Sequence, residues 1–517
     1  MRNRLLALVG ASVVLVGACA VIALELSASD DSAARGPNFL VIDIDVLSWD
    51  HIGVVRDGVS NTPNIDALAR RGVRFTNAFS HSGWTLPALS SLLSGMLPSP
   101  ARANWRSVPW FPASAHLMPE ILGYYGYSTA AFFGYGVAGS SPFSARFQHV
   151  YVRTPPASGP IPDPPTEDVL TFLDRAPTPF FALVHDANMH HTYLYNREDV
   201  AEGFPPPTAS EKDLLYSSVY AHLSATQGEA AAQEAIRRHY DRMVGYYDAA
   251  VGTILDRLEE DGLADDTVVV VTSDHGDDFF EHANVAHGLL YDSTIRVPLI
   301  VYDPRAQMSG QELSTVVQYT DLAPTLLERA GVPRAQDMVG QSLLPLLGLS
   351  AGAYTEGPVY AMTSPCHVAW RAGGGRKLVL RQQEDGDEWF PAGGLNQVHV
   401  TLPDFLQAQG LTDLVLPDCA MMGGGELGGR GSVLVEYYDL GADPGERRNL
   451  VDVAPQDAAA LLPPLLRTLD ERARAVAGTV GQPLSGAEVE ALRRQGYWGL
   501  VDPTSASRHA PGEGAAP

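Results

Sequence analysis

Two side chains that could bind a metal follow a run of four valines in the second half of the chain. Valines 268–271 are followed, after two more residues, by Asp274 and His275. A short apolar run of this kind is typical of a buried parallel strand, and in open α/β sheets ligands bind beyond the carboxyl ends of the strands. A carboxylate beside an imidazole is a common pair of ligands for a divalent metal. We therefore expect both residues to be metal ligands; a loop aspartate beside a hydrogen-bonded histidine is the alternative.

A second acidic motif ends another apolar segment near the start of the chain. Asp43 and Asp45 close the segment 37–45 and lie two residues apart, so on an extended strand they face the same side. A buried carboxylate is costly unless it is paired or bound to a cation. Asp45, nearer the end of the strand, is the better candidate for a metal ligand. Asp43 fits either a ligand or a buried structural acid.

A threonine close to a helix start is the candidate nucleophile. In the segment 82–95, Pro87 suits the first turn of a helix, so Thr85 is expected just ahead of its N-terminus. The helix dipole and free N–H groups there favour an anionic oxygen. A hydroxyl placed beside a cation can be activated for nucleophilic attack. The alternative is an ordinary helix cap, a position at which threonine is common.

The elements that would position these residues are visible in the hydrophobic pattern. We expect a helix over 62–72, an alternating strand over 73–79, and a helix over 246–260 after a polar, mostly helical insertion at 201–241. Strands at 359–362, 367–371, 377–381 and 433–439 and a helix near 457–477 are expected after residue 350. A chain of 517 residues is long enough for a large α/β domain and a smaller one.

The net charge of the chain argues against one class of partner, and its N-terminal residues predict where the protein is located. A formal net charge of −25 disfavours nucleic acid as a partner. Residues 1–26 combine a basic start with an apolar run and predict a lipoprotein signal with Cys19 lipidated, a membrane anchor, or a cleaved secretion signal. Each places the protein in the cell envelope, outside the cytoplasmic face, with 27–36 as a linker. Cys366 and Cys419 could then pair, although the sequence does not show that they are close.

Several motifs, in order, resemble the sulfatase family within the alkaline-phosphatase superfamily. The matching segments are 37–53, 62–79 (TPNIDALARRGVRFTNAF), 85–95, 185–193, 246–281 (ending in VVVVTSDHGDDFFE), 297–347 and 435–450. The resemblance implies an α/β fold with a large, mostly parallel sheet sandwiched by helices. It also implies a catalytic domain at 37–350 and a C-terminal α+β subdomain at 351–500 with a smaller antiparallel sheet plus helix. Residues 501–517 are expected to be a disordered tail.

The resemblance also implies roles for individual residues. Asp45, Thr85, Asp274 and His275 would hold one divalent cation, whether Ca, Mn, Mg or Zn, and Thr85 would be the nucleophile of an in-line displacement. His190 and His287 would be catalytic and would contact the substrate anion or the leaving group. Arg296 could bind the anion or form a salt bridge with Asp292, and His282 competes with His287 for its role. A second metal at Asp186, His190 and His287 is the alternative to a single ion.

Departures from the family pattern decide which ester we favour. Thr85 stands where sulfatases carry a cysteine or serine that becomes formylglycine, and Ala88 and Leu89 replace the serine and arginine of that motif. The chain has only two lysines, Lys212 and Lys377, whereas sulfatases place lysines on the sulfate. Threonine nucleophiles are typical of the phosphodiesterases and phosphotransferases of the superfamily.

Three hypotheses follow from these departures. We favour hydrolysis or transfer of a phosphoric ester, because phosphoryl transfer needs mainly positioning and charge stabilisation. A sulfatase without formylglycine and a non-catalytic envelope binding protein are the alternatives. The expected partner is an anionic ester, with an envelope lipid or a glycan as candidates.

Overall fold

The structure is a computed structural model of the chain. It describes residues 36–56, 58–99, 107–108, 115–134, 143–153, 164–186, 189, 223–282, 287–364, 367–382, 400–411, 433–476 and 482–483. The predictions for residues 1–26 with Cys19, for His190, for Cys366 and Cys419 and for the tail fall outside these ranges. Within them, no helix combines the length and the apolar content that a membrane span requires.

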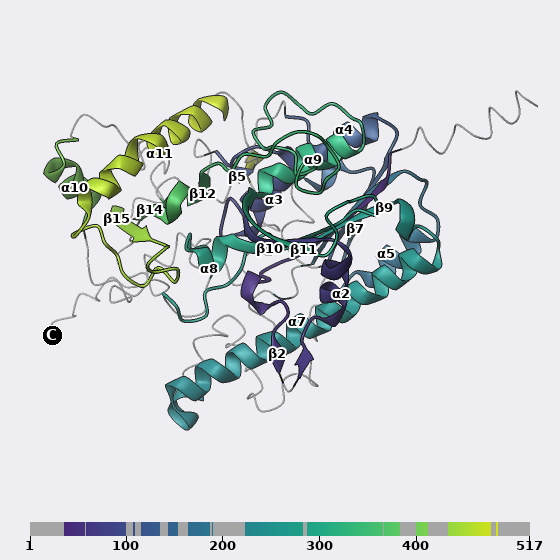
Figure 1. Ribbon diagram of the computed structural model, residues 1–517, viewed down its shortest axis with the longest axis horizontal. Coiled ribbons are helices and arrows are strands. Elements are labelled where there is room, and N and C mark those ends of the chain that lie inside the picture. The colour runs from purple at the N-terminus through teal and green to yellow at the C-terminus, as the bar shows by residue number, and fades with distance from the viewer. Residues whose placement is uncertain are drawn as a thin grey trace, which may run out of the picture.

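A mixed sheet of eight strands forms the centre of the larger part of the molecule (Figure 1). Its strands, in spatial order, are β11 (Gln311–Gln318), β4 (Val73–Phe79), β10 (Arg296–Tyr302), β9 (Thr267–Thr272), β1 (Asn38–Ile44), β8 (Phe180–Asp186), β6 (Ser128–Phe133) and β7 (His149–Val152). Only β10 runs antiparallel to its neighbours, and the other adjacent pairs are parallel. The carboxyl ends of β1, β8 and β9 therefore meet at one edge, where the candidate ligands lie.

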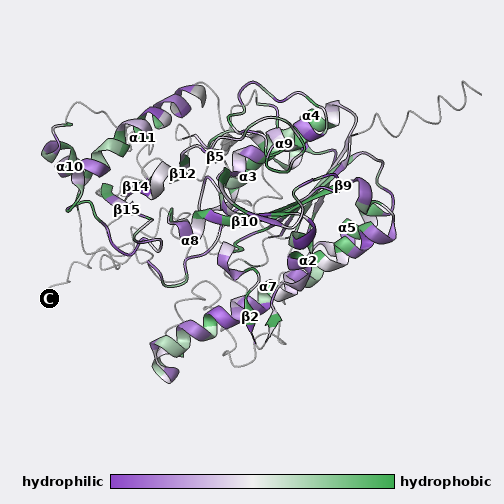
Figure 2. Cartoon of the chain, in the orientation of Figure 1, coloured by the Kyte–Doolittle hydropathy of each residue, from purple (hydrophilic) through white to green (hydrophobic). Residues whose placement is uncertain are grey.

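Helices cover both faces of this sheet. One face carries α2 (Pro63–Arg71), α5 (Thr166–Leu173) and α7 (Glu229–Glu260), and the other carries α3 (Thr85–Ser94), α4 (Met118–Tyr124) and α9 (Leu322–Arg329). The residues of β1 alternate between the two cores: Phe39 and Val41 pack on the α3 side, and Leu40 and Ile42 on the α7 side. In Figure 2, β9 is green, whereas purple and green alternate along α7, as expected for a helix with one buried face.

A smaller antiparallel sheet lies beside the large one. Its strands, in spatial order, are β12 (Val359–Ser364), β13 (His367–Ala372), β14 (Arg376–Gln382) and β15 (Val433–Asp439), and it is packed by α10 (Leu402–Ala408) and α11 (Pro455–Val476). The short pairs β2 (Val55–Arg56) with β3 (Val59–Ser60), and β5 (Ser107–Val108) with β16 (Gln482–Pro483), complete the strands. The predicted fold class is confirmed, and the exact domain boundaries stay a prediction.

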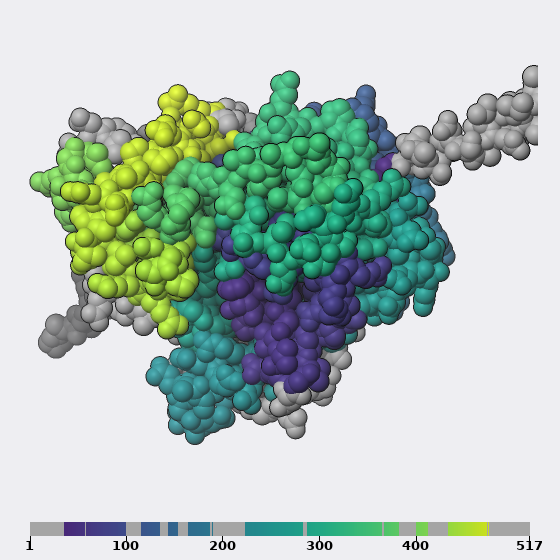
Figure 3. Space-filling model, viewed as in Figure 1, coloured from purple at the N-terminus to yellow at the C-terminus, as the bar shows by residue number. Residues whose placement is uncertain are grey.

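A buried lysine connects the two sheets. Lys377 on β14 is fully buried, and its Nζ lies 2.8 Å from Asp292 Oδ1 and 2.8 Å from Glu446 Oε1. Asp292 begins α8 (Asp292–Ile295), which leads into β10 of the large sheet. Figure 3 shows the C-terminal residues, in yellow, packed closely against the green and teal residues of the larger part. The burial of Glu446 raises its pKa to about 7 despite the lysine.

Replacing Lys377 with methionine should lower the free energy of unfolding by about 3–5 kcal/mol, because Glu446 would stay buried without its cation and Asp292 would keep only Arg371. Urea unfolding of the purified protein measures this change. The exposed neighbour Arg376 offers a matched control, for which the same substitution should change the free energy by less than about 0.5 kcal/mol. Equal effects at the two positions would show that the buried pair does not stabilise the packing of the two sheets.

Candidate metal centre

The two acidic motifs converge because their strands are neighbours. β1 and β9 are parallel and hydrogen-bonded, with Asp43 opposite Thr272, so both chains leave the sheet at the same level. Phe39, Val41 and the even-numbered valines of β9 pack in the core that contains α3. Asp45 and Asp274 follow the last residues of these strands by one and two positions, so they lie at the same edge of the sheet.

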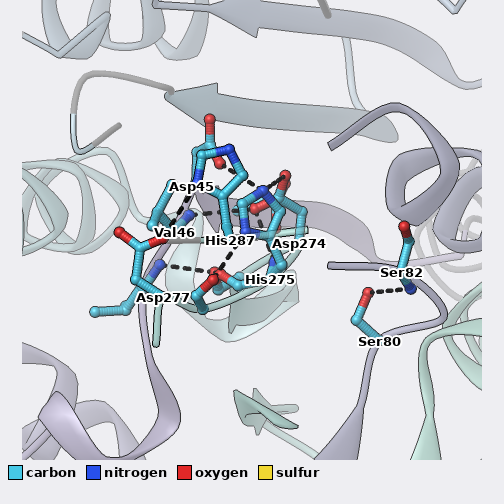
Figure 4. Close-up of polar contacts among 12 residues, drawn as sticks. Asp45, Val46, Ser80, Ser82, Asp274, His275, Asp277 and His287 are labelled. Carbon is cyan, nitrogen blue, oxygen red and sulfur yellow. Dashed lines mark hydrogen bonds and ion pairs between the residues drawn. The ribbon is translucent and has the colours of Figure 1, made fainter. Parts of the chain in front are cut away.

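Three buried atoms of these motifs point toward one another (Figure 4). His275 Nε2 lies 3.3 Å from Asp45 Oδ1 and 3.6 Å from Asp274 Oδ2. The three side chains are at most 2% exposed, and none of these atoms has a hydrogen-bond partner within the described part of the chain. Buried polar atoms without partners are costly. Two carboxylate oxygens and one imidazole nitrogen at this spacing fit a divalent cation, which would satisfy all three.

The other atoms of these residues fix their orientation. His275 Nδ1 lies 3.0 Å from the carbonyl oxygen of Gly276, which accepts its proton and leaves Nε2 with a free lone pair for a metal. Asp274 Oδ1 accepts hydrogen bonds from the backbone N–H of His275 (2.9 Å) and of Val46 (3.4 Å). Val46 has a φ of +65°, which is strained for a β-branched residue. The strained turn at Val46 therefore directs the backbone N–H of Val46 toward Asp274.

The carboxylates of Asp45 and Asp274 repel each other when both are charged, because both are buried. Burial and then the charge of Asp274 raise the pKa of Asp45 well above its ordinary value. Burial also acts to raise the pKa of Asp274, but His275, His185 and a hydrogen bond with Thr85 outweigh it, and the pKa of Asp274 is lowered. A bound divalent cation would remove the repulsion that Asp45 experiences.

Thr85 contacts this centre and does not cap its helix. α3 begins at Thr85, and the N-cap is Trp84, which makes no capping bond through its side chain. The Thr85 side chain is 2% exposed, and it lies near enough to the Asp274 carboxylate to help lower the pKa of that acid. The alternative of an ordinary helix cap is therefore wrong, because Thr85 is the first residue of the helix and Trp84 is the cap. Its role as nucleophile stays a prediction.

A close backbone contact brings His287 to the same place. The N–H of Gly288 donates to the carbonyl oxygen of Gly83 over 2.7 Å, and a Cβ on Gly83 would clash with the next carbonyl of that segment. The His287 ring lies nearly parallel to that of His275, with 5.0 Å between the centroids, and its Nδ1 is 3.2 Å from Asp277 Oδ1 (Figure 4). Burial and the neighbouring His275 lower the pKa of His287 well below its ordinary value.

His282 was the alternative to His287 for the catalytic role, and it contacts other residues. Its Nδ1 lies 2.6 Å from Asp278 Oδ2, and its ring stacks on Tyr291 with 3.8 Å between the centroids. The structure thus places His287, and not His282, beside the candidate ligands. His190 lies outside the described residues, so its proposed role is not placed by the structure.

Arg296 does not form the expected salt bridge with Asp292. Its Nε and Nη2 donate to the carbonyl oxygen of Thr76, and its guanidinium lies 3.6 Å from the centre of the Trp49 ring. Asp292 is instead paired with Lys377 and Arg371, so the expected salt bridge is not formed. Binding of a substrate anion by Arg296 stays a prediction.

The structure describes two of the three residues of the alternative second metal site, Asp186 and His287. Asp186 ends β8, is 3% exposed and lies against Gly134, where a Cβ would clash with its carboxylate. His287 lies near the first site, as described above. With His190 outside the described residues, the second ion stays a prediction.

The sequence did not assign a role to a polar pair just below the centre. Asp43 Oδ2 lies 2.7 Å from His185 Nδ1, and Asp43 Oδ1 accepts a hydrogen bond of 2.7 Å from the Tyr319 hydroxyl. Both oxygens of Asp43 therefore have partners, as the structural alternative for this acid requires. The signal for His185 was present, because it closes the apolar run of β8 just as Asp43 and Asp45 close that of β1.

Comparisons with known proteins agree with this architecture. A sequence model of the family described as Sulfatase matches residues 37–332. Arylsulfatase K of Xenopus laevis is 39% identical over 136 residues, which are 26% of this chain and 25% of that protein. The ulvan-active sulfatase of Formosa agariphila is 26% identical over 350 residues, 60% of this chain and 65% of that protein. The solved phosphonate monoester hydrolase of Agrobacterium radiobacter has a TM-score of 0.57 at 18% identity, covering 87% of this chain and 100% of that chain.

The two sulfatase alignments span less than two thirds of those relatives' own lengths, and the likeness to the phosphonate monoester hydrolase shows a shared fold. The family model covers more than half of the chain, including β1, α3 and β9. The chain therefore belongs to the sulfatase family.

Proposed function

We propose that the protein is a metal-dependent ester hydrolase that uses Thr85 as its nucleophile, and that its preferred substrates are phosphoric esters. The observation that carries this proposal is the convergence of three buried atoms without hydrogen-bond partners, on Asp45, Asp274 and His275, beside the Thr85 hydroxyl. A non-catalytic binding protein would have no need to keep such a costly arrangement.

Each residue of the site has its own proposed role in an in-line displacement. A cation held by Asp45, Asp274 and His275 would supply positive charge for the attacking oxygen and the transferred group. The Thr85 hydroxyl lies near the Asp274 carboxylate, and that acid would accept a hydrogen bond that orients the hydroxyl for attack. The Thr85 oxygen forms a bond to phosphorus while the bond to the leaving alcohol breaks and that oxygen takes up a proton. Water then attacks the phosphorus, and the Thr85 oxygen leaves and regains a proton. Inorganic phosphate is released from a monoester, and a phosphate monoester from a diester.

The choice of phosphorus over sulfur rests on residues that the chain lacks. Thr85 cannot be oxidised to an aldehyde by the route open to cysteine and serine. Of the two lysines, Lys377 is buried in its pair with Asp292 and Glu446, and Lys212 lies outside the described residues. The names of the sequence relatives favour the second candidate, a sulfatase that works without formylglycine.

A panel of three substrates tests the proposal. The purified full-length protein, loaded with divalent metal in detergent, is assayed with an aryl phosphate, a bis-aryl phosphodiester and an aryl sulfate. We expect kcat/KM for at least one phosphoric ester to exceed that for the sulfate by about tenfold or more, a difference of about 1.4 kcal/mol in transition-state binding. Turnover of the sulfate alone would reverse the assignment, and turnover of none would favour a binding protein.

The same preparation tests the metal count. We propose one equivalent of divalent metal per chain, measured by elemental analysis after gel filtration. Two equivalents would instead support the additional site at Asp186, His190 and His287. An envelope position through residues 1–26, with a lipid or glycan ester as substrate, belongs to the same proposal and rests on the N-terminal residues alone.

A further inference from the structure

The most exposed aromatic side chains that the structure describes lie at the end of helix α4. Tyr124 is 86% exposed and Tyr125 is 50% exposed, and their ring centroids lie 5.4 Å apart in an edge-to-face arrangement. The helix packs on the sheet through other residues, Met118, Pro119 and Leu122. Two adjacent aromatic rings left in water mark a candidate interaction surface.

This tyrosine pair lies at the amino edge of the large sheet, the edge opposite the metal centre. Ser128, which begins β6 just after the pair, is level with Phe180 at the start of β8. The N–H of Phe180 donates to the Asn38 side chain at the start of β1 over 3.1 Å. Because β1 has seven residues, about 23 Å separate this edge from the carboxyl edge. In Figure 1, α4 accordingly lies far from α8, which precedes β10 at the carboxyl edge.

The chain enters the fold at the same amino edge. The described residues begin at Gly36, where a Cβ would clash with the hydroxyl of Tyr127, the buried neighbour of the pair. The predicted anchor ends at residue 26, and the ten residues 27–36 span at most about 35 Å when fully extended. An anchor in residues 1–26 would therefore keep the amino edge close to the membrane.

Another apolar side chain lies at this edge, on the other side of the entry point. Met308 is 38% exposed and belongs to the loop between β10 and β11. The loop is fixed at the amino edge, because the N–H of Gly310 donates to the carbonyl oxygen of Gly72 just before β4. In the order of strands, β1 lies between this loop and β6. The tyrosine pair and Met308 thus flank the start of β1.

The charge of the protein favours an aromatic contact with a membrane over an electrostatic one. A formal net charge of −25 repels the anionic headgroups that basic proteins bind. Tyrosine combines an apolar ring with a polar hydroxyl, and it is enriched at the level of the headgroups for this reason. The pair therefore fits a bilayer surface without requiring anionic lipid.

We propose that Tyr124 and Tyr125 lie in the headgroup region of the membrane that holds residues 1–26, so that the metal centre faces away from this membrane. The inference rests on the envelope position in the proposed function. It narrows the expected substrates, because headgroup esters of the same leaflet would lie about 23 Å from the carboxyl edge. Soluble esters, or esters that project far from the membrane, fit this orientation.

A second exposed apolar pair would give the opposite orientation. Val55 and Val59 are 65% and 67% exposed, and they lie on the β2–β3 hairpin that follows β1 at the carboxyl edge. Contact of this hairpin with the bilayer would turn the metal centre toward the lipid. The linker would then have to extend along the length of the sheet, which costs conformational entropy. The position of Gly36 thus favours the tyrosine pair.

Photolabelling of the full-length protein tests this orientation. The protein is reconstituted in phosphatidylcholine vesicles that contain a phosphatidylcholine with a photoreactive headgroup, then illuminated and digested. Mass spectrometry should find about tenfold more lipid on the peptide with Tyr124 and Tyr125 than on the peptide with Val55 and Val59, because the edges lie about 23 Å apart. A soluble phosphoric ester should be turned over in these vesicles as fast as in detergent.

A double substitution of the tyrosines gives the comparison. In the Tyr124→Ser/Tyr125→Ser variant the labelling ratio should fall to within about threefold, because a flexible linker alone does not orient the fold. Turnover of the soluble ester should stay at the wild-type value. The Val55→Ser/Val59→Ser variant is the matched control and should keep the wild-type preference for the amino edge.

Labelling mainly on the hairpin would overturn the inference, and so would a tyrosine variant with the wild-type ratio. Protein that does not float with the vesicles would overturn the envelope position and this inference together. Protein that floats and is labelled at the tyrosine pair, but hydrolyses no ester, would support the orientation and count only against the proposed hydrolase.

Discussion

Alanine in place of Thr85 should lower kcat/KM for every ester that the protein hydrolyses by about 10⁴-fold or more, a loss typical of enzymes deprived of their nucleophile. The fold should persist, because the substitution removes only a hydroxyl and a methyl group from the first residue of α3. Metal content should also persist, since Asp45, Asp274 and His275 are untouched. Steady-state assays and elemental analysis of the same sample measure both quantities.

Serine is the matched control at this position. Thr85→Ser keeps the oxygen next to Asp274 and should retain kcat/KM within about tenfold of wild type, which is 1.4 kcal/mol or less. Rapid acid quenching during turnover of a phosphoric ester, followed by peptide mass spectrometry, should find the added phosphate on the peptide that contains Thr85. An alanine variant with wild-type turnover would place the nucleophile on another residue.

The sequence predicted the elements whose apolar pattern is long and regular. Four consecutive valines gave β9, and the strand at 73–79 was predicted to the residue. The C-terminal strands were placed within one or two residues, and α11 within two. These segments are predictable because burial on one or both faces fixes the identity of their side chains locally. The convergence of Asp45 with Asp274 and His275 followed from the same strands and is confirmed.

Contacts across long sequence distances were not predictable in this way. His185 pairs with Asp43 across 142 positions, and Tyr319 reaches the same carboxylate across 276. Arg296 binds a backbone carbonyl that no side-chain pattern reveals. In each case the partner depends on the order of strands in the sheet, which a single sequence leaves open. The start of α3 at Thr85 was missed by a residue or two because a proline at the third helical position is compatible with more than one start.

Replacing Asp45 with asparagine should show whether this residue binds the metal or only supports the fold. The variant loses an anionic ligand, so kcat should fall by about 10³-fold or more, corresponding to the several kcal/mol that a bound cation contributes to the transition state. Wild-type protein should gain about 2.7 kcal/mol of stability when free metal exceeds its dissociation constant 100-fold, and the variant should gain much less at that concentration.

When a chelator removes the metal, wild type should no longer be more stable than the Asp45→Asn variant. Without metal, Asp45 is a buried carboxylate whose pKa is raised by burial and by Asp274, so its charge costs stability at neutral pH. The neutral amide removes that cost, and the metal-free variant should therefore be at least as stable as metal-free wild type. Asp248→Asn is the matched control, because Asp248 is a buried acid that binds Asn64 and Ile65 away from the centre. It should keep the metal-dependent stabilisation and lose stability with or without chelator. If Asp45→Asn instead behaved like Asp248→Asn, Asp45 would be a structural acid and the ion would have to bind elsewhere.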